Sequence, residues 1–191
     1  MIKYPNGKKL INSNKTVSAG NRGMSLEKEI NQTNKFYLIS KVANIHKKPT
    51  PIQIVKVDYP HRSAAKISEA YFKVPSTTDY NGVYNSRAID FEAKECASKT
   101  SFPFSSIHKH QIEHLKDVIN HGAIGFMIIR FSFYDKTYLV DGKKIIEAYN
   151  GKRKSIPYSW FDEEAHLIPH GFNPRVDYLK IVNQVYLGGK I

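Results

Sequence analysis

The spacing of apolar side chains along the chain predicts one helix followed by extended segments. Between residues 25 and 42 apolar or half-apolar positions recur at helical intervals, and Ser25 is a suitable N-cap. Residues 52–57 are rich in β-branched side chains and predict a strand, and residues 67–74 predict a second extended run. The stripe on the predicted helix consists of Leu26, Ile30, Thr33 and Tyr37.

The middle of the chain predicts a turn, a long strand and a helix. Asn81-Gly82 favours positive φ, so we expect the chain to reverse or bend there and to continue as a strand over residues 83–94. A helix is predicted from about Ile107, and Gly122 can end it. Its apolar face consists of Ile112, Leu115 and Ile119.

Two further strands and two helices complete the pattern. Residues 123–133 and 136–146 are predicted to be strands joined by a hairpin around Tyr134-Asp135. Residues 160–167 predict a short helix, and Asn173 can cap a last helix whose first residue is Pro174. Helices and strands in this order predict an α/β fold with a mixed central β-sheet flanked by helices.

The composition narrows the class of protein. The chain has 191 residues, enough for one domain with a real core, and its 41% hydrophobic content excludes a wholly disordered chain. A single cysteine, Cys96, excludes a disulfide framework and a cysteine-built zinc site. The most apolar run, residues 123–129, is far shorter than the ~20 residues that a membrane-spanning helix needs. The N-terminus also lacks the apolar region of a secretory signal, so we expect a cytoplasmic protein with no membrane partner.

Positive charge is concentrated at one end of the sequence. The chain has 29 Lys+Arg against 17 Asp+Glu, a net charge of +12, which makes nucleic acid the default partner. Residues 1–23 carry five cations and no acid, and we expect a flexible basic arm before a single domain over residues 24–191. Residues 45–74 carry six cations against two acids, so the two segments together hold nine of the twelve net charges.

The segment of about residues 51–74 interleaves basic with aromatic side chains, a pattern that suits contact with a nucleic-acid backbone and its bases. Composition alone does not separate such a projection from a solvated hairpin with a few core aromatics, or a binding arm from an ordinary disordered terminus. The side chains expected to contact DNA are Lys56, Tyr59, Arg62, Lys66, Phe72 and Lys73 in this segment, and Lys8, Lys9 and Arg22 in the arm.

Residues 87–95 carry the most informative pattern. On a strand, Asp90, Glu92 and Lys94 share one face, opposite an apolar one. A carboxylate and an ammonium group inside a sheet are costly to bury without partners, and they make sense where a divalent metal meets a phosphate. Asp79 lies 13 residues before Glu92 and can approach it if the chain bends near Asn81-Gly82. Otherwise Glu92 and Lys94 are a surface ion pair and Asp79 is an ordinary turn residue.

An acid, a spacer and Glu-x-Lys on a strand resemble the core motif of the restriction-endonuclease-like nucleases. The wider sequence, from about Asn21 to the C-terminal helix, is similar to the RecU family of bacterial Holliday junction resolvases. Thr78 departs from the broader nuclease pattern, in which Pro often precedes the Asp. The resemblance to the family is carried by Asn21-Arg22-Gly23-Met24, Lys48-Pro49-Thr50-Pro51-Ile52-Gln53, residues 73–83 and Asp90-Phe91-Glu92-Ala93-Lys94-Glu95.

The resemblance implies a homodimeric, Mg²⁺-dependent endonuclease that resolves four-way (Holliday) DNA junctions by paired symmetric nicks in recombination and repair, with Mn²⁺ able to replace Mg²⁺. Asp79 and Glu92 would be metal carboxylates, and Lys94 would stabilise charge during catalysis. Thr77 and Gln111 would be further metal ligands. Residues of about 51–74 would be a protruding stalk that enters the junction centre. The resemblance also implies association with the bacterial nucleoid and contacts with recombinase and branch-migration helicase proteins.

Other titratable side chains have simpler interpretations. Asp90 is a rival metal ligand, but we expect it to orient Lys94 or Arg87. His110 and His114 have the i, i+4 spacing of two zinc ligands on a helix, yet the Glu of the HExxH pattern is absent between them. A basic or partly buried helix face is therefore favoured over a zinc site. Cys96 is expected to be a buried thiol.

Two other functions compete with junction cleavage. A non-catalytic junction-binding or branch-migration accessory protein would share the arm and the stalk, but it would not need Asp79, Glu92 and Lys94 together. A restriction-type duplex endonuclease would keep those three residues, but it leaves the projecting basic segment unexplained.

Overall fold

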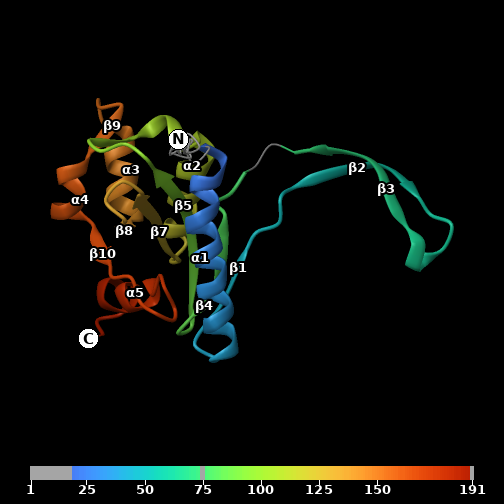
Figure 1. The fold of residues 1–191 in the computed structure, drawn as a ribbon, viewed down its shortest axis with the longest axis horizontal. Coiled ribbons are helices and arrows are strands. Elements are labelled where there is room, and N and C mark those ends of the chain that lie inside the picture. Colours follow the sequence, from blue (N-terminus) through green and yellow to red (C-terminus); the bar gives the residue numbers. More distant parts are fainter. Residues whose placement is uncertain (1–18, 74–75, 190–191) are drawn as a thin grey trace, which may run out of the picture.

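The computed structural model describes residues 19–73 and 76–189 and contains one six-stranded sheet and two small two-stranded sheets (Figure 1). The predicted arm lies outside the described residues up to residue 18, and Lys8 and Lys9 with it. The helices are α1 (Ala19–Ile39), α2 (Lys109–Asn120), α3 (Gly142–Asn150), α4 (Tyr158–Glu164) and α5 (Tyr178–Tyr186). The strands are β1 (Asn44–Lys47), β2 (Ile52–Asp58), β3 (Lys66–Phe72), β4 (Tyr80–Tyr84), β5 (Arg87–Cys96), β6 (Ser101–Pro103), β7 (Ile124–Phe131), β8 (Lys136–Asp141), β9 (Ser155–Pro157) and β10 (His166–Ile168).

The six-stranded sheet is mixed, as the sequence predicts. Its order is β1-β4-β5-β7-β8-β10, with β5 and β7 parallel and every other neighbouring pair antiparallel. The crossover from β5 to β7 passes through α2, which packs on the sheet. Every residue of β7 is buried, which explains why its sequence is an almost unbroken apolar run. The α/β fold class is therefore confirmed.

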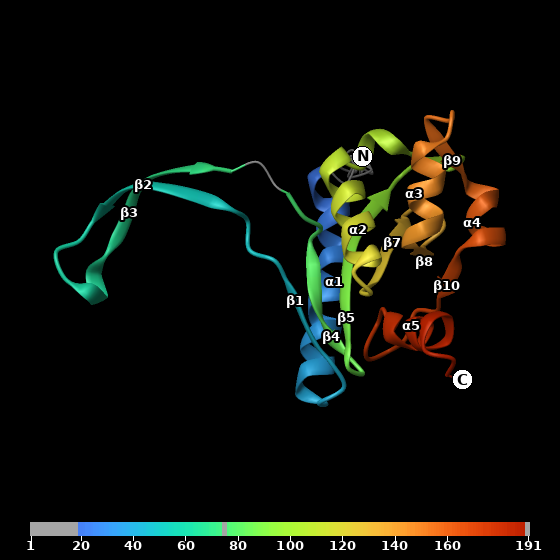
Figure 2. The same ribbon diagram turned by 180° about the vertical axis from the view of Figure 1, so that it is seen from behind.

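The hydrophobic core lies on the two faces of this sheet, and β7 contributes side chains to both faces. Ile124, Phe126 and Ile128 belong to a cluster with residues of α1 and α5, whereas Met127 and Ile129 belong to a second cluster with residues of α2, α3 and α4. Figures 1 and 2 show these helices on the sheet. Each large apolar side chain buried here contributes about 2 kcal/mol to folding. The sheet that carries the candidate site is therefore held from both sides.

The turn predicted at Asn81-Gly82 is wrong in position. Both residues lie inside β4, and the chain reverses instead at Asn85 and Ser86, which have φ of 48° and 61°. Residues 83–94 are consequently the end of one strand and most of the next, not a single strand. Gly82 allows close approach of two strands and does not form a turn. A Cβ at this position would overlap the carbonyl oxygen of Asn44 on neighbouring β1.

The strand predicted over residues 136–146 is also wrong in its second half. Strand β8 ends at Asp141, and α3 begins directly after it. The Asp141 carboxylate accepts hydrogen bonds from the backbone N–H groups of Lys143 and Lys144, which is N-capping chemistry. Helix and strand patterns are ambiguous for a short apolar run, so the sequence did not separate the two.

Several helix boundaries differ from the predictions. Helix α1 begins at Ala19, not after Ser25, and ends at Ile39. Helix α5 begins at Tyr178, not at Pro174. Helix α2 agrees with its prediction, and Gly122 follows it with φ of 90°. None of the helices in the described part of the chain combines enough length and hydropathy to span a membrane.

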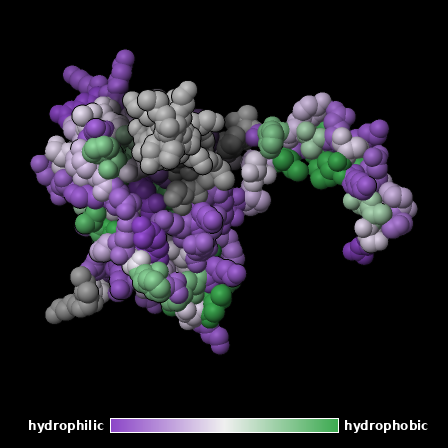
Figure 3. Space-filling view, viewed as in Figure 1, coloured by the Kyte–Doolittle hydropathy of each residue, from purple (hydrophilic) through white to green (hydrophobic). Residues whose placement is uncertain are grey.

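Strands β2 and β3 form a ribbon that projects far from the rest of the molecule (Figures 1 and 2). Every residue of both strands is exposed, and a short 3-10 turn (Arg62–Ala64) lies at the tip. We call residues 51–73 the stalk. The space-filling view shows apolar and polar residues side by side along it (Figure 3). An isolated two-stranded ribbon is only marginally stable in water. Its exposed apolar side chains are typical of a surface that contacts a partner.

Candidate active site

Strand pairing brings Asp79 and Glu92 together. Tyr80 of β4 lies opposite Phe91 of β5, which places the residue before Tyr80 beside the residue after Phe91. The backbone N–H of Asp79 donates a hydrogen bond to Glu92 Oε2 at 3.0 Å. The approach predicted from the sequence is therefore confirmed, although it arises from an antiparallel ladder and not from a turn at Asn81-Gly82.

The Glu92 carboxyl group is the most perturbed acid of this site. Only 1% of the residue is exposed, because β5 lies inside the sheet. The pKa of Glu92 is raised to about 7, mainly by burial; Lys94 opposes this rise, and the charge of Asp79 adds to it. A buried carboxyl with a second acid beside it is costly to ionise alone. Such a pair is typical of catalytic and metal-binding sites.

Lys94 shares a face of β5 with Glu92, as the alternation predicts. Lys94 Nζ lies 2.7 Å from Glu92 Oε1, and its side chain is 19% exposed. Oε1 is otherwise buried, and as a carboxylate oxygen it has a second lone pair beyond its contact with Lys94. The ammonium group is therefore partly exposed to solvent, whereas the acid that it contacts is buried.

The two neutral ligands implied by the resemblance, Thr77 and Gln111, make local hydrogen bonds. Thr77 is half-buried, and its hydroxyl donates to the Thr78 carbonyl at 3.2 Å. Gln111 is buried on the first turn of α2, where its Oε1 accepts from the His108 backbone N–H at 2.9 Å. The structure therefore shows both side chains in local hydrogen bonds.

The acids of this site fit a hard divalent cation. Asp79 and Glu92 supply carboxylate oxygens, and Glu92 Oε1 has unused acceptor capacity. Mg²⁺ takes oxygen ligands and is commonly held by one or two carboxylates with waters and substrate phosphates completing its shell. Among the described residues no group of three or more His, Cys, Asp or Glu side chains could hold a metal. A site of this kind would therefore be completed by neutral oxygens and by substrate.

Asp90 has other partners than the sequence predicts. Its Oδ2 lies 2.8 Å from Lys48 Nζ, and its Oδ1 accepts a hydrogen bond from the Thr78 hydroxyl. His114 Nε2 lies 3.2 Å from Oδ1. The expected contacts of Asp90 with Lys94 or Arg87 are wrong.

Lys48, Thr78 and His114 were missed as site residues. A buried carboxylate such as that of Asp90 requires a partner, so a nearby cation could be expected. The sequence did not identify which of the chain's many cations lies nearest to it. Arg87, one of the expected partners of Asp90, instead donates to the Gly122 carbonyl.

His108 and His110 lie at the start of α2, and Cys96 ends β5. His110 Nε2 is buried without a hydrogen-bond partner, and burial lowers the pKa of His110, with His108 and Lys94 lowering it further. The rings of His108 and His110 stack 5.4 Å apart. Cys96 is buried as predicted, and burial raises the pKa of its thiol.

The stalk side chains that are predicted to contact DNA are exposed to solvent. Tyr59 is 63% exposed, Phe72 is 84% exposed and Arg62 lies at the tip. Arg22 lies within α1, but its side chain is outside the described residues. The exposed basic residues of the stalk are Lys56, Arg62, Lys66 and Lys73. None of them contacts Glu92 or Lys94 in the described structure, so binding and chemistry would lie on separate elements.

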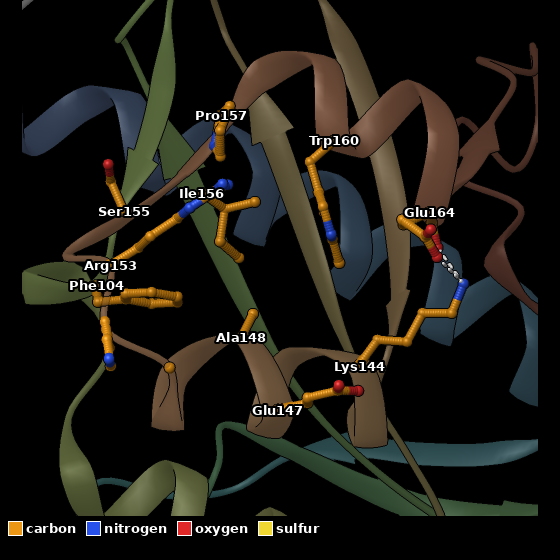
Figure 4. Close-up of a pocket in the computed structure, with 12 residues that line it drawn as sticks. Phe104, Lys144, Glu147, Ala148, Arg153, Ser155, Ile156, Pro157, Trp160 and Glu164 are labelled. Carbon is orange, nitrogen blue, oxygen red and sulfur yellow. Dashed lines mark hydrogen bonds and ion pairs between the residues drawn. The ribbon is translucent and has the colours of Figure 1, made fainter.

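A cavity of about 510 Å³ lies elsewhere, between α3, β9 and α4. Trp160, Ile156 and Phe104 supply part of its lining, and the Lys144–Glu164 ion pair lies on one side (Figure 4). None of its lining residues belongs to the predicted site. The candidate chemistry lies instead on the paired strands β4 and β5, near the point where the stalk joins the sheet, and not in this cavity.

Comparison with known proteins identifies one family. A model of the family described as "RecU: Recombination protein U" matches residues 21–184. The "Holliday junction resolvase RecU" of Bacillus cereus (strain B4264) is 53% identical, covering 97% of this chain and 98% of the relative. Proteins of the same name from Bacillus cytotoxicus and Bacillus mycoides are 53% and 52% identical with the same coverage. With a family match over most of its length and such similarity to full-length relatives, the chain belongs to the RecU family.

Proposed function

We propose that this protein is a Holliday junction resolvase, an endonuclease that cleaves four-way DNA junctions. The observation that carries the proposal is the group of buried Glu92 with half-buried Asp79 and Lys94, directly beside the base of a basic stalk. A site for phosphodiester hydrolysis and a separate projecting surface for branched DNA are what this activity requires. The names of the relatives support the same activity.

The proposed hydrolysis uses Mg²⁺, held by the carboxylates of Asp79 and Glu92 with Thr77 and Gln111 as neutral ligands. The bound cation supplies an activated water and Lewis-acid polarisation of the scissile phosphate. Gln111 would reach the site by giving up its hydrogen bond to the His108 backbone N–H. Mn²⁺ would serve in the same place, since it also prefers carboxylate and carbonyl oxygens.

The chain's own residues orient the reaction. The backbone N–H of Asp79 donates to Glu92 Oε2, which keeps the two residues adjacent. Lys94, on the solvent side of Glu92, would place its ammonium charge against the phosphate and stabilise the negative charge of the transition state. Burial of Glu92 in a low-dielectric sheet strengthens these charge interactions.

The stalk would select the branched substrate. Its exposed aromatic side chains offer stacking surfaces to unpaired bases at a junction centre, and its cations neutralise phosphates along the arms. A four-way junction has two equivalent scissile strands, so paired symmetric nicks would follow from a homodimer with two sites. We propose this dimer, together with recombinase and branch-migration helicase partners and a cytoplasmic location at the bacterial nucleoid, from the family resemblance.

The proposal is tested with two labelled substrates of the same sequence, a synthetic four-way junction and a linear duplex. The wild-type chain in Mg²⁺ should cut the junction and leave the duplex largely intact, and a chelator should abolish cutting. Equal cleavage of both substrates would favour a restriction-type enzyme. Binding without cleavage in Mg²⁺ and in Mn²⁺ would favour a non-catalytic accessory protein.

Junction binding should weaken steeply with salt, and Arg62→Ala should reduce that dependence. Each phosphate neutralised by a cation releases counterions, so losing one contact lowers the slope of log K against log salt by about one. Binding titrations at several salt concentrations measure the slope. Lys180→Ala, an exposed cation on α5 away from the stalk, is the control and should leave the slope unchanged. A flat salt response of the wild-type chain would contradict the electrostatic account.

A further inference from the structure

The two legs of the stalk return to the body of the protein directly beside Asp79. The first leg leaves β1 through Lys48, and the second comes back through Thr77 and Thr78. One hydrogen bond between the legs joins the Lys73 N–H to the Pro51 carbonyl at 3.0 Å. Below it the Lys48 N–H donates to the Asp79 carbonyl at 2.7 Å. Any displacement of the stalk is therefore applied next to a proposed catalytic carboxylate.

The Nζ atom of Lys48 links the first leg, which carries it, to three other elements: β5, the second leg and α2. Its Nζ lies 2.8 Å from Asp90 Oδ2 on β5 and 3.1 Å from the Thr78 hydroxyl on the second leg. It also lies 3.3 Å from His114 Nε2 on α2. The side chain is 18% exposed and that of Asp90 is 9% exposed, so a charge-assisted contact here is stronger than one in water.

We propose that Lys48 is a positioning residue that holds the base of the stalk against β5, so that seating of the stalk in a junction sets the position of the Asp79 carboxylate against Glu92. This inference rests on the proposed function and adds a route from substrate recognition to chemistry. An ammonium group has three N–H donors; Asp90 and Thr78 accept from Lys48, and His114 Nε2 lies within 3.3 Å of the same nitrogen. Lys48 is thus not available for a DNA phosphate, unlike the exposed cations of the stalk.

The consequence for catalysis differs from that of a binding residue. Without Lys48, the stalk would still present Arg62 and its aromatic side chains to the junction, so affinity should be kept. The Asp79 carboxylate would lose its fixed relation to Glu92, and misplacement of a reacting group by about 1 Å costs up to about 10²-fold in rate. The rate at saturating junction, and not the dissociation constant, should therefore fall.

The test compares Lys48→Met with Lys180→Met, a matched removal of an exposed ammonium group on α5. Single-turnover cleavage at saturating junction and junction affinity without divalent metal are measured for both. For Lys48→Met we expect a rate about tenfold to a hundredfold lower and an unchanged dissociation constant. The junction-to-duplex rate ratio should fall, and half-maximal cleavage should need more Mg²⁺. Lys180→Met should stay within about twofold of wild type throughout.

A second variant keeps the test decisive if Lys48→Met does not fold. Thr78→Val keeps the side-chain shape but removes the hydroxyl shared by Lys48 and Asp90. It should shift the rate and the Mg²⁺ requirement in the same direction by a smaller factor, and Lys48→Arg should restore part of the rate. Thermal unfolding of each variant shows whether it is folded under the assay conditions. If Lys48→Met is unfolded, Thr78→Val decides the outcome.

Three results would overturn the inference. Weaker junction binding with an unchanged saturating rate would make Lys48 a DNA contact. An equal loss on junction and duplex would separate Lys48 from the stalk. Unchanged cleavage, with the wild type active, would show that the contact has no role in positioning. If the wild type itself does not cut junctions, the proposed function fails, and this inference fails with it.

Discussion

Glu92→Gln should reduce cleavage of a four-way junction by roughly 10³-fold or more while junction binding is kept. The substitution keeps the size of the side chain but removes the charge that the proposed site requires at its most buried position. Stabilisation of transition-state charge by a bound cation is worth several kcal/mol, and each 1.4 kcal/mol is a factor of ten in rate. Binding should be unchanged or slightly tighter, because a negative charge near the DNA is removed.

The matched control for this prediction is Glu113→Gln. Glu113 lies on the exposed surface of α2, where it pairs with Lys109 one turn away. Exposed i, i+4 pairs contribute little, so the variant should cleave and bind like the wild type. Single-turnover assays with a labelled junction separate rate from affinity. Cleavage by Glu92→Gln at the rate of Glu113→Gln would remove Glu92 from the mechanism.

The same substitution should stabilise the metal-free protein at alkaline pH. In the folded chain the pKa of Glu92 is about 7, whereas the ordinary value is 4.5. The folded state therefore holds a proton that the unfolded state has lost, and stability falls as pH rises from 4.5 to about 7. Above that window the cost is complete, at about 3 kcal/mol, and Glu92→Gln removes it.

Chemical denaturation in the presence of a chelator measures this effect. The gain in unfolding free energy of Glu92→Gln should be largest at about pH 8 and should disappear at about pH 4. Added Mg²⁺ should then stabilise the wild type more than the variant, because a ligand stabilises only the state that binds it. A variant that is less stable than wild type at alkaline pH, or a gain independent of pH, would contradict the raised pKa of Glu92.

The candidate chemistry was predictable because it depends on local alternation. The side chains of β5 alternate faces, so Glu92 and Lys94 follow from the sequence once the strand is recognised. The approach of Asp79 was predicted with the wrong turn, since Asn81-Gly82 lies in a strand and Asn85 and Ser86 make the reversal. The predicted approach of Asp79 to Glu92 is nevertheless correct, because the pairing of Tyr80 with Phe91 brings these two acids together.

The contacts around Asp90 could not be predicted in the same way. Lys48 and His114 come from β1's C-terminal extension and from α2, distant in the sequence from the carboxylate they meet. Such contacts are set by tertiary packing, and neither alternation nor turn chemistry reports on them. The missed helix α3 has a related cause, because its apolar residues fit a strand as well as a helix until the Asp141 cap is seen.

Strand-resolved cleavage of a four-way junction tests the central claim most directly. Each of the four strands is labelled in turn and incubated in Mg²⁺ with the wild-type chain, Glu92→Gln or Glu113→Gln. We predict nicks at symmetric positions in two opposing strands with the wild type and Glu113→Gln, and none with Glu92→Gln. Nicks that persist in Glu92→Gln, or wild-type cleavage without such strand pairing, would contradict junction resolution by the Asp79–Glu92–Lys94 site.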